Sequence, residues 1–288
     1  MKVSKYIEAF RALSYSELFS SECLDALKNI QQSEYGKFDA SQAIYEINLS
    51  KPDLTADASF RVHDDFPKVH WLEFDFENYS SGEKLQPCIY LEDDVLEAHE
   101  VLSKVFGHKK WEKFRKPVDD LKILLKDKKM IISHLGDMGC RGGKFSETIR
   151  IVLQMIKYQK TVELLKLLNY NCDVASFEKK VSEFAPYAFK NIFLFDFDIF
   201  PDGSISDRIG ITFFAKTSLN DAENLMKFLV KKNFCSPERA EAIIKWRSGE
   251  LPENIDVQEI CHMKFQFEKD EIVAVKIYLR HRDFFLTL

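Results

Sequence analysis

Charged and aromatic side chains recur at every second position in four stretches of this sequence, and that spacing places them on one face of extended strands. The cations on these faces are Arg61, Arg150, Arg208, Lys276 and Arg280. The anions are Asp57, Glu73, Asp75, Asp196 and Asp198. The aromatic residues among them are Trp71, Phe200, Phe214 and Tyr278.

The chemistry of these side chains suits one class of substrate. Arginine and lysine bind phosphate oxygens, and the faces of aromatic rings stabilise a nearby positive charge. A substrate with a polyanionic head and an apolar tail would use both kinds of group, and an allylic diphosphate is such a substrate. We expect the cations to hold the diphosphate. We expect the prenyl group and its acceptor to lie among Trp71, Glu73, Asp196, Asp198, Phe200, Phe214 and Tyr278.

The stretch from residue 191 to residue 215 shows the alternation most clearly. Its first arm places apolar side chains on one face, and Asp196, Asp198 and Phe200 on the other. Asp202 and Gly203 follow, and an Asp-Gly pair between two alternating runs is typical of a β-hairpin turn. The second arm repeats the alternation. This stretch is therefore predicted to be a hairpin with one apolar face and one charged face.

The same alternation predicts three more hairpins, with helices between them. The strand pairs are 57–63 with 69–77, 129–135 with 145–155, and 262–268 with 271–280; their turns are 64–67, 139–143 and 269–270. Helical spacing predicts two helices within 4–47, helices over 94–106 and 110–128 with an interruption at Pro117, two helices within 157–190, and helices over 218–232 and 236–247. Repeated strand-strand-helix units make an internal repeat.

Strands that come as hairpins form an antiparallel sheet, and closure of that sheet would remove both of its edges. We therefore predict an α+β fold, an antiparallel β-barrel built from four or five hairpins and surrounded by a ring of helices. The whole chain, residues 1–288, is expected to form this single domain. The charged strand faces would line the lumen.

Composition excludes some functions. The net charge of -5 argues against a nucleic-acid partner bound by bulk electrostatics, which needs a basic face. The six cysteines have no metal-ligand spacing and predict reduced thiols in a cytoplasmic protein. No apolar run is long enough to span a bilayer and no signal peptide is visible, so we expect no membrane partner.

Four short pieces carry a resemblance to a known family. They are DASFR at residues 57–61, a hydrophobic run that ends at His134-Leu135-Gly136, FDFDIFPDG at 195–203, and FEKDEIVAVKIYL at 267–279. With the hairpins separated by helices, the chain from about residue 40 to its end resembles the ABBA, or PT-barrel, prenyltransferases, and among them the cyanobactin-type peptide prenyltransferases. The resemblance implies transfer of a dimethylallyl or geranyl group from its diphosphate to a side chain of a ribosomally made peptide.

The resemblance also implies roles for single residues. Asp57 would assist the acceptor, Tyr278 would shield the prenyl cation, and the diphosphate would be bound by Arg61, Arg150 and Lys276. Arg208 and Arg280 join the diphosphate group on the alternation alone. The arginine that the family has on its second strand lacks a counterpart, because His70 or Trp71 occupies that region. Mg²⁺ is implied as an ion bound through the diphosphate, with Asp196 or Asp198 as carboxylate ligands.

The acceptor is expected to be cationic. Five carboxylates are many for a pocket that receives a neutral aromatic side chain, so a peptide arginine is favoured, with tyrosine or tryptophan as alternatives. Two other functions stay open. One is a barrel that binds an isoprenoid or a peptide without catalysis. The other is a phosphatase that uses Asp196 and Asp198 as an Asp-x-Asp pair, although Ile199-Phe200-Pro201 stands where that class has Gly-Thr.

Overall fold

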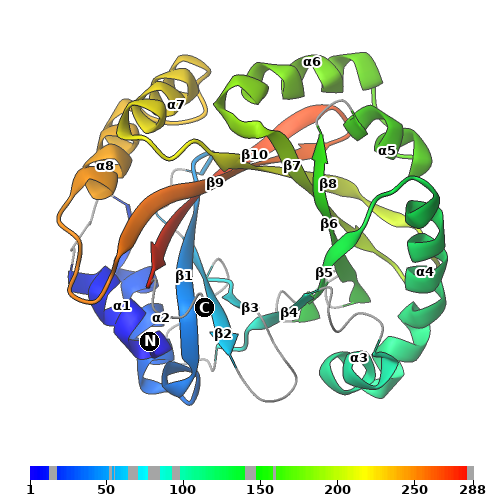
Figure 1. Cartoon of the computed structure of the whole chain (residues 1–288), viewed down its shortest axis with the longest axis horizontal. Coiled ribbons are helices and arrows are strands. Elements are labelled where there is room, and N and C mark those ends of the chain that lie inside the picture. The colour runs from blue at the N-terminus through cyan, green and yellow to red at the C-terminus, as the bar shows by residue number, and fades with distance from the viewer. Residues whose placement is uncertain are drawn as a thin grey trace. The chain divides into compact units, whose positions relative to one another are not determined.

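The computed structural model describes residues 1–283 apart from 13–17, 52–53, 55, 64–70, 77–84, 93–97, 140–146 and 158–159. The strands follow one another in the hydrogen-bonded order β1-β10-β9-β8-β7-β6-β5-β4-β3-β2, which closes into the antiparallel barrel that the sequence predicted (Figure 1). They are β1 (Asp39–Asn48), β2 (Ala56–His63), β3 (Trp71–Phe74), β4 (Cys88–Glu92), β5 (Ile132–Asp137), β6 (Ile149–Lys157), β7 (Ala188–Ile199), β8 (Ile205–Ala215), β9 (Val257–Glu268) and β10 (Glu271–Arg282).

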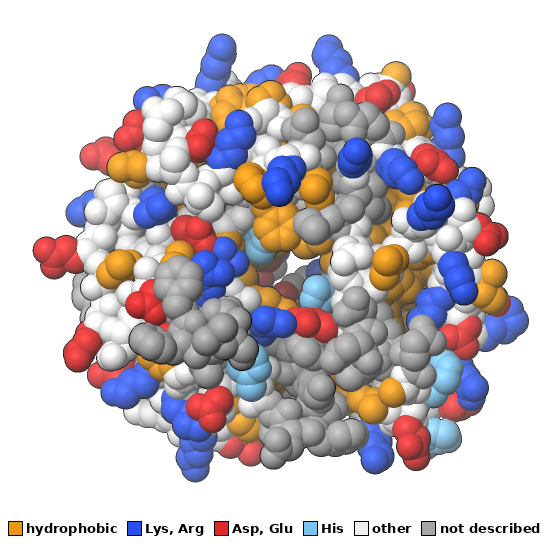
Figure 2. Space-filling view, viewed as in Figure 1, with side chains coloured by type: hydrophobic (Ala, Val, Ile, Leu, Met, Phe, Trp, Pro, Cys, Tyr) orange, Lys and Arg blue, Asp and Glu red, His pale blue; other side chains and the backbone are white. Residues whose placement is uncertain are grey.

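Helices precede the barrel strands or lie between them in the sequence. They are α1 (Val3–Ala12), α2 (Ser21–Gln32), α3 (His99–Phe106), α4 (His108–Asp127), α5 (Thr161–Leu167), α6 (Val174–Phe184), α7 (Leu219–Lys231) and α8 (Pro237–Ser248). Among the described residues, none of these helices combines the length and apolar character that a membrane crossing requires. Figure 2 shows Lys and Arg side chains interspersed with Asp and Glu over the visible face.

The chain divides into two compact units. Unit 1 comprises Met1–Pro87, Ala215–Met263 and Ala274–Leu288, and unit 2 comprises Cys88–Phe214 and Lys264–Val273. Unit 1 therefore holds β1 to β3 with α1, α2, α7 and α8, whereas unit 2 holds β4 to β7, nearly all of β8, and α3 to α6. Strands β9 and β10 contribute residues to both units.

In unit 2 the apolar strand faces are covered by aromatic packing. Phe195 and Phe197 of β7 are at most 1% exposed. Phe184 of α6 stacks on Phe265 of β9 with ring centroids 3.6 Å apart, and Phe177 of α6 packs on Phe267. The alternation of side chains thus directs the opposite strand face away from the helices. We call this opposite face the inner face, and we use the same term for the half-buried strand face of β2 and β10 in unit 1.

Unit 1 contains a buried histidine in its core. His281 of β10 is fully buried and stacks on Trp246 of α8 at a centroid separation of 5.4 Å. Its Nε2 donates a hydrogen bond of 2.8 Å to Oε1 of Gln258, while Nδ1 has no hydrogen-bond partner in the described part of the chain. Burial lowers the pKa of His281 from 6.5 to about 3. Burial, together with the charge of Arg280, also lowers the pKa of His262 to about 3.

These two histidines predict a loss of stability in acid. Below about pH 6.5 the imidazoles of His262 and His281 become protonated in the unfolded chain but stay neutral in the folded protein. Their contribution is therefore complete above pH 6.5 and is lost as the pH falls toward about 3. We expect the unfolding midpoint, measured by calorimetry, to fall from pH 7 to pH 5, and to fall less steeply in His281→Gln. The exposed His108, changed to Gln, is the control, and an unchanged slope in His281→Gln would contradict this assignment.

Three predictions of local structure were wrong. Residues 39–48 form β1 and not helix, because long-range pairing with β2 and β10 outweighs the helical spacing of their apolar residues. Strand β4 was not predicted at all. Pro117 does not interrupt α4, because side chains before and after it, including Phe114 and Val118, are buried along one continuous face.

The other elements agree with the sequence within a few residues. The four hairpins appear as β2 with β3, β5 with β6, β7 with β8, and β9 with β10. Helix α8 begins after Ser236, whose hydroxyl accepts the amide hydrogen of Arg239. Helix α3 begins at His99, and the earlier expected start at residue 94 lies outside the described residues, as do the turns at 64–67 and 140–143. That residues 1–288 form a single domain stays a prediction.

Candidate active site

In unit 2, strand register aligns four residues across four strands. Tyr90 of β4 lies opposite Gly136 of β5, Gly136 lies opposite Arg150 of β6, and Arg150 lies opposite Asp198 of β7. A Cβ atom at Gly136 would lie 2.5 Å from the Tyr90 ring, so the glycine leaves room for that ring. The Tyr90 hydroxyl donates to Sδ of Met138 at 3.6 Å. The row therefore combines an aromatic ring with a buried ion pair.

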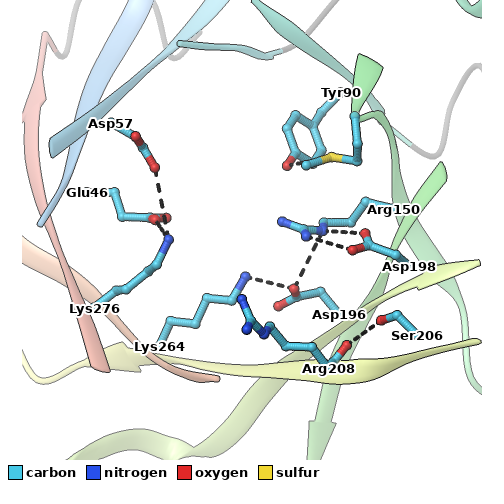
Figure 3. Close-up of polar contacts among 11 residues, drawn as sticks. Glu46, Asp57, Tyr90, Arg150, Asp196, Asp198, Ser206, Arg208, Lys264 and Lys276 are labelled. Atoms are coloured by element: carbon cyan, nitrogen blue, oxygen red, sulfur yellow. Dashed lines mark hydrogen bonds and ion pairs between the residues drawn. The ribbon is translucent and has the colours of Figure 1, made fainter. Parts of the chain in front are cut away.

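Arg150 is fixed by a two-point contact with Asp198. Its Nε and Nη2 donate to the two carboxylate oxygens at 2.8 and 3.0 Å (Figure 3). Arg150 is 8% exposed and Asp198 is 2% exposed. Burial works against the charge of Arg150, but Asp198, Tyr90 and Asp196 outweigh it and raise the pKa of Arg150 well above its ordinary value. A planar guanidinium held in this way is oriented before any ligand arrives.

Asp196 lies two residues earlier on the same face of β7 and contacts two cations. Its Oδ1 accepts a hydrogen bond of 2.7 Å from Nζ of Lys264 and lies 3.9 Å from Nε of Arg150 (Figure 3). Asp196 and Lys264 are each 6% exposed. We call Arg150, Asp196, Asp198 and Lys264 the unit 2 ion cluster.

A glycine of β8 makes this cluster sterically feasible. A Cβ atom on Gly210 would lie 2.3 Å from Oδ2 of Asp196 and 2.4 Å from Cε of Lys264. Both contacts are far shorter than van der Waals distance, so any larger residue must move the ion pair.

Gly210→Ala should therefore destabilise the protein. We expect a loss of about 1–3 kcal/mol in the free energy of unfolding, because an added methyl group in a packed site forces its neighbours to shift. Urea unfolding measures the change. Thr212→Ser, at the next position on the same face of β8, is the control and should cost less than about 1 kcal/mol. Equal stability of Gly210→Ala and the parent would show that the cluster relaxes without cost.

Unit 1 holds a second set of inner-face charges. Glu46 of β1 lies opposite Asp57 of β2 and Tyr278 of β10. Nζ of Lys276 donates to Oε1 of Glu46 and lies 4.0 Å from Oδ2 of Asp57 (Figure 3). Asp57 Oδ1 also accepts the amide hydrogen of Phe76 at 3.2 Å. We call Glu46, Asp57 and Lys276 the unit 1 ion cluster.

Arg280 lies on the same strand as Lys276 and has a carboxylate partner of its own. Its Nε donates to Oε1 of Glu259 at 2.9 Å, and Nη2 reaches the same oxygen. Nearby, burial raises the pKa of the Cys261 thiol to about 12. A thiol with so high a pKa is not a nucleophile at neutral pH.

The structure brings some of the predicted site residues together. Unit 2 joins Arg150, Asp196 and Asp198, and unit 1 joins Asp57 with Lys276. Arg208 is different: its side chain is 47% exposed and lies 3.7 Å from the carboxylate of Glu268. The half-buried members of the predicted set lie on or next to the barrel strands, and their roles stay predictions; they are Arg61, Trp71, Glu73, Asp75, Phe200, Phe214 and Tyr278.

Sequence reasoning missed two residues of these clusters, Lys264 and Glu46, and two residues next to them, Tyr90 and Glu259. Lys264 alternates with His262 and Gln266, so the same pattern that found Arg150 could have found it. Glu46 and Tyr90 lie on β1 and β4, which were not predicted as strands. Glu259 lies in the part of β9 that precedes the expected start at residue 262.

The described residues do not form a site for an ion held by protein ligands alone. In the described ranges, no group of three or more His, Cys, Asp or Glu side chains could hold a metal. The Asp198 oxygens both accept hydrogen bonds from Arg150, and Asp196 already accepts one from Lys264. That Asp196 or Asp198 contacts Mg²⁺, and that Mg²⁺ arrives with a diphosphate, stay predictions.

Both clusters present cations that already bind carboxylates. A phosphate oxygen accepts the same charge-assisted hydrogen bonds as a carboxylate oxygen, and the guanidinium fork fits either group. The arrangement can therefore exchange an internal carboxylate for an external phosphate. Electrostatic stabilisation of a leaving diphosphate requires such buried, oriented cations.

Comparison with known proteins places this geometry in a known fold. No family model matches the sequence, and no curated protein matches it. Among solved structures, AnaPT from Neosartorya fischeri superposes with a TM-score of 0.59 at 10% identity, covering 95% of this chain and 93% of AnaPT.

Two further solved structures superpose on this chain in the same way. For 5-dimethylallyltryptophan synthase from Streptomyces coelicolor the TM-score is 0.55 at 8% identity, with 96% and 97% of the two chains covered. For prenyltransferase PriB in a ternary complex with L-tryptophan and dimethylallyl thiolodiphosphate it is 0.55 at 7% identity, with 97% and 96% covered. The chain therefore has the fold of the ABBA, or PT-barrel, prenyltransferases.

Proposed function

We propose that this protein is a prenyltransferase that moves a dimethylallyl or geranyl group from its diphosphate to a side chain of a ribosomally made peptide. The observation that carries the proposal is the buried, oriented Arg150 on the inner face of a barrel with the prenyltransferase fold. The cyanobactin-type resemblance of the sequence supports the peptide acceptor.

The donor half of the reaction needs cations. The carbon–oxygen bond between the allylic carbon and the diphosphate breaks, and the electron pair leaves with the diphosphate. Arg150 and Lys264 stabilise the charge that develops on the leaving oxygens. Aromatic side chains such as Tyr90 shield the allylic cation from water.

The acceptor half needs a nucleophile and a base. The inner-face charges of unit 1 include carboxylates at Glu46, Asp57 and Glu259, against Lys276 and Arg280. These carboxylates support a cationic acceptor, a peptide arginine. A guanidine nitrogen forms the new bond to the allylic carbon, and Asp57 takes the proton that the nitrogen loses.

A second acceptor class is supported by a different observation. The PriB structure contains L-tryptophan, and the Streptomyces enzyme is named for dimethylallyltryptophan. An aromatic acceptor in this chain would attack through a ring carbon, and Glu46 or Asp57 would accept a hydrogen bond from the indole N–H.

Mass spectrometry of matched peptides tests the proposal. Peptides that differ only in carrying arginine, tyrosine, tryptophan or alanine at one position are incubated with dimethylallyl or geranyl diphosphate, with magnesium present or chelated. We expect a mass increase of one prenyl group, largest for arginine. Modification confined to tyrosine or tryptophan would contradict the arginine acceptor. Binding of the diphosphate without modification of any peptide would favour a non-catalytic barrel, and release of phosphate would favour a phosphatase.

A further inference from the structure

Asp196 is bound to the cations that would bind the donor. It accepts a hydrogen bond from Lys264 at 2.7 Å and lies 3.9 Å from Nε of Arg150. We propose that Asp196 is an internal counter-ion that the diphosphate displaces from Lys264, so that this carboxylate weakens donor binding and promotes release of the diphosphate product. The inference rests on the proposed function and deepens it by assigning a regulatory role within the donor site.

The two aspartates of the cluster differ in how firmly they are held. Both carboxylate oxygens of Asp198 accept hydrogen bonds from Arg150, at 2.8 and 3.0 Å, and Asp198 is 2% exposed. Asp196 makes one short contact with Lys264, through a single carboxylate oxygen, and one long contact with Arg150. Asp198 is therefore the positioning residue for Arg150, and Asp196 is the carboxylate that an incoming anion displaces at lower cost.

Charge balance gives the reason for the displacement. In the unit 2 ion cluster, the two cations Arg150 and Lys264 are matched by the two carboxylates Asp196 and Asp198. An electrically neutral cluster offers little net attraction to a polyanion. Once Asp196 turns away from Lys264, two cations face one carboxylate, and phosphate oxygens take the vacated hydrogen bonds.

The same residue favours product release. A carboxylate that stays near the bound diphosphate repels it, and its return to Lys264 competes with the phosphate oxygens for the ammonium hydrogens. Gly210 keeps the space in which Asp196 and Lys264 meet, because a Cβ atom there would lie within 2.4 Å of both side chains. The glycine therefore allows the return.

An alternative role for Asp196 makes the opposite prediction. If Asp196 held a magnesium ion on the diphosphate, its carboxylate would strengthen donor binding when magnesium is present. The two roles are separated by measuring binding with and without the metal.

Calorimetric titration with inorganic pyrophosphate tests the inference on the full chain. We compare the parent protein with Asp196→Asn, in EDTA and in magnesium. Removal of one negative charge next to the site is expected to tighten binding by roughly fivefold to tenfold in both buffers. Asp207→Asn, which removes the same charge from an exposed position on β8, is the control and should change binding by less than about twofold. Lys264→Met added to Asp196→Asn should abolish the gain.

Each outcome has one meaning. Unchanged or weaker binding by Asp196→Asn in EDTA, or weaker binding in magnesium, overturns the role of Asp196 and leaves the proposed function in place. Absence of pyrophosphate and thiolodiphosphate binding by the parent protein overturns both. If Asp196→Asn does not fold, Asp196→Ser, which also removes the charge, is measured in its place with the same expectation.

Discussion

Arg150→Met should destabilise the protein strongly. Asp198 is 2% exposed and would lose both of its hydrogen bonds from Arg150, so a buried carboxylate would stand without its counter-charge. Breaking a buried ion pair from one side costs about 3–5 kcal/mol. Urea unfolding at pH 7 measures this loss. Because the guanidinium would also be absent from the donor site, we expect kcat/KM for prenyl transfer to fall by about 100-fold or more.

A double variant separates the two effects. Arg150→Met with Asp198→Leu removes both charges and fills the space with apolar groups, which is often neutral for stability. We expect the free energy of unfolding to return to within about 1–2 kcal/mol of the parent, whereas donor binding stays lost. Recovery of donor binding together with stability would show that Arg150 acts only through the fold.

Glu46→Gln should impair the acceptor half of the reaction and spare the donor half. Glu46 is 7% exposed and contacts Lys276. It lies on β1, opposite Asp57 of the neighbouring strand β2. Loss of a charge-assisted hydrogen bond to a cationic acceptor is worth about 1.5–3 kcal/mol, which is roughly 10-fold to 150-fold in kcat/KM. Steady-state rates with the arginine peptide measure the effect, and the thermal shift with the thiolodiphosphate should not decrease.

The control for this variant is Glu241→Gln on the exposed face of α8. It removes the same charge from unit 1 and should leave the rates unchanged. If Glu46→Gln lowers donor binding and peptide turnover equally, the carboxylate acts by positioning Lys276 and not by receiving the acceptor.

The sequence predicted the barrel because alternation is a local property. In β7, for example, the two-residue period alone puts Asp196 and Asp198 on one face and the phenylalanines on the other. Alternation does not predict which strand lies next to which, so the sequence did not show that Arg150 binds Asp198. That pair depends on the register of β6 against β7, which long-range pairing determines.

Strand β1 shows a second limit. A register shift between Ala40 and Gln42 interrupts its two-residue alternation, and Ala40, Ala43 and Ile47 fall at helical spacing. Because residues 39–47 were predicted to be helix, Glu46 was not included in the predicted site. Lys264 was missed although the alternation of its strand was predicted. Its pairing with Asp196, 68 residues away in the sequence, is not visible in that local pattern.

Thermal unfolding with dimethylallyl or geranyl thiolodiphosphate tests whether this barrel binds an isoprenoid diphosphate, and it requires no peptide. A ligand that binds only the folded protein raises the unfolding midpoint. We expect a clear rise in the parent protein and no rise in the double variant Arg150→Met with Asp198→Leu. Absence of a rise in the parent with either chain length, with magnesium present and with it chelated, would contradict the claim that this barrel binds an isoprenoid diphosphate.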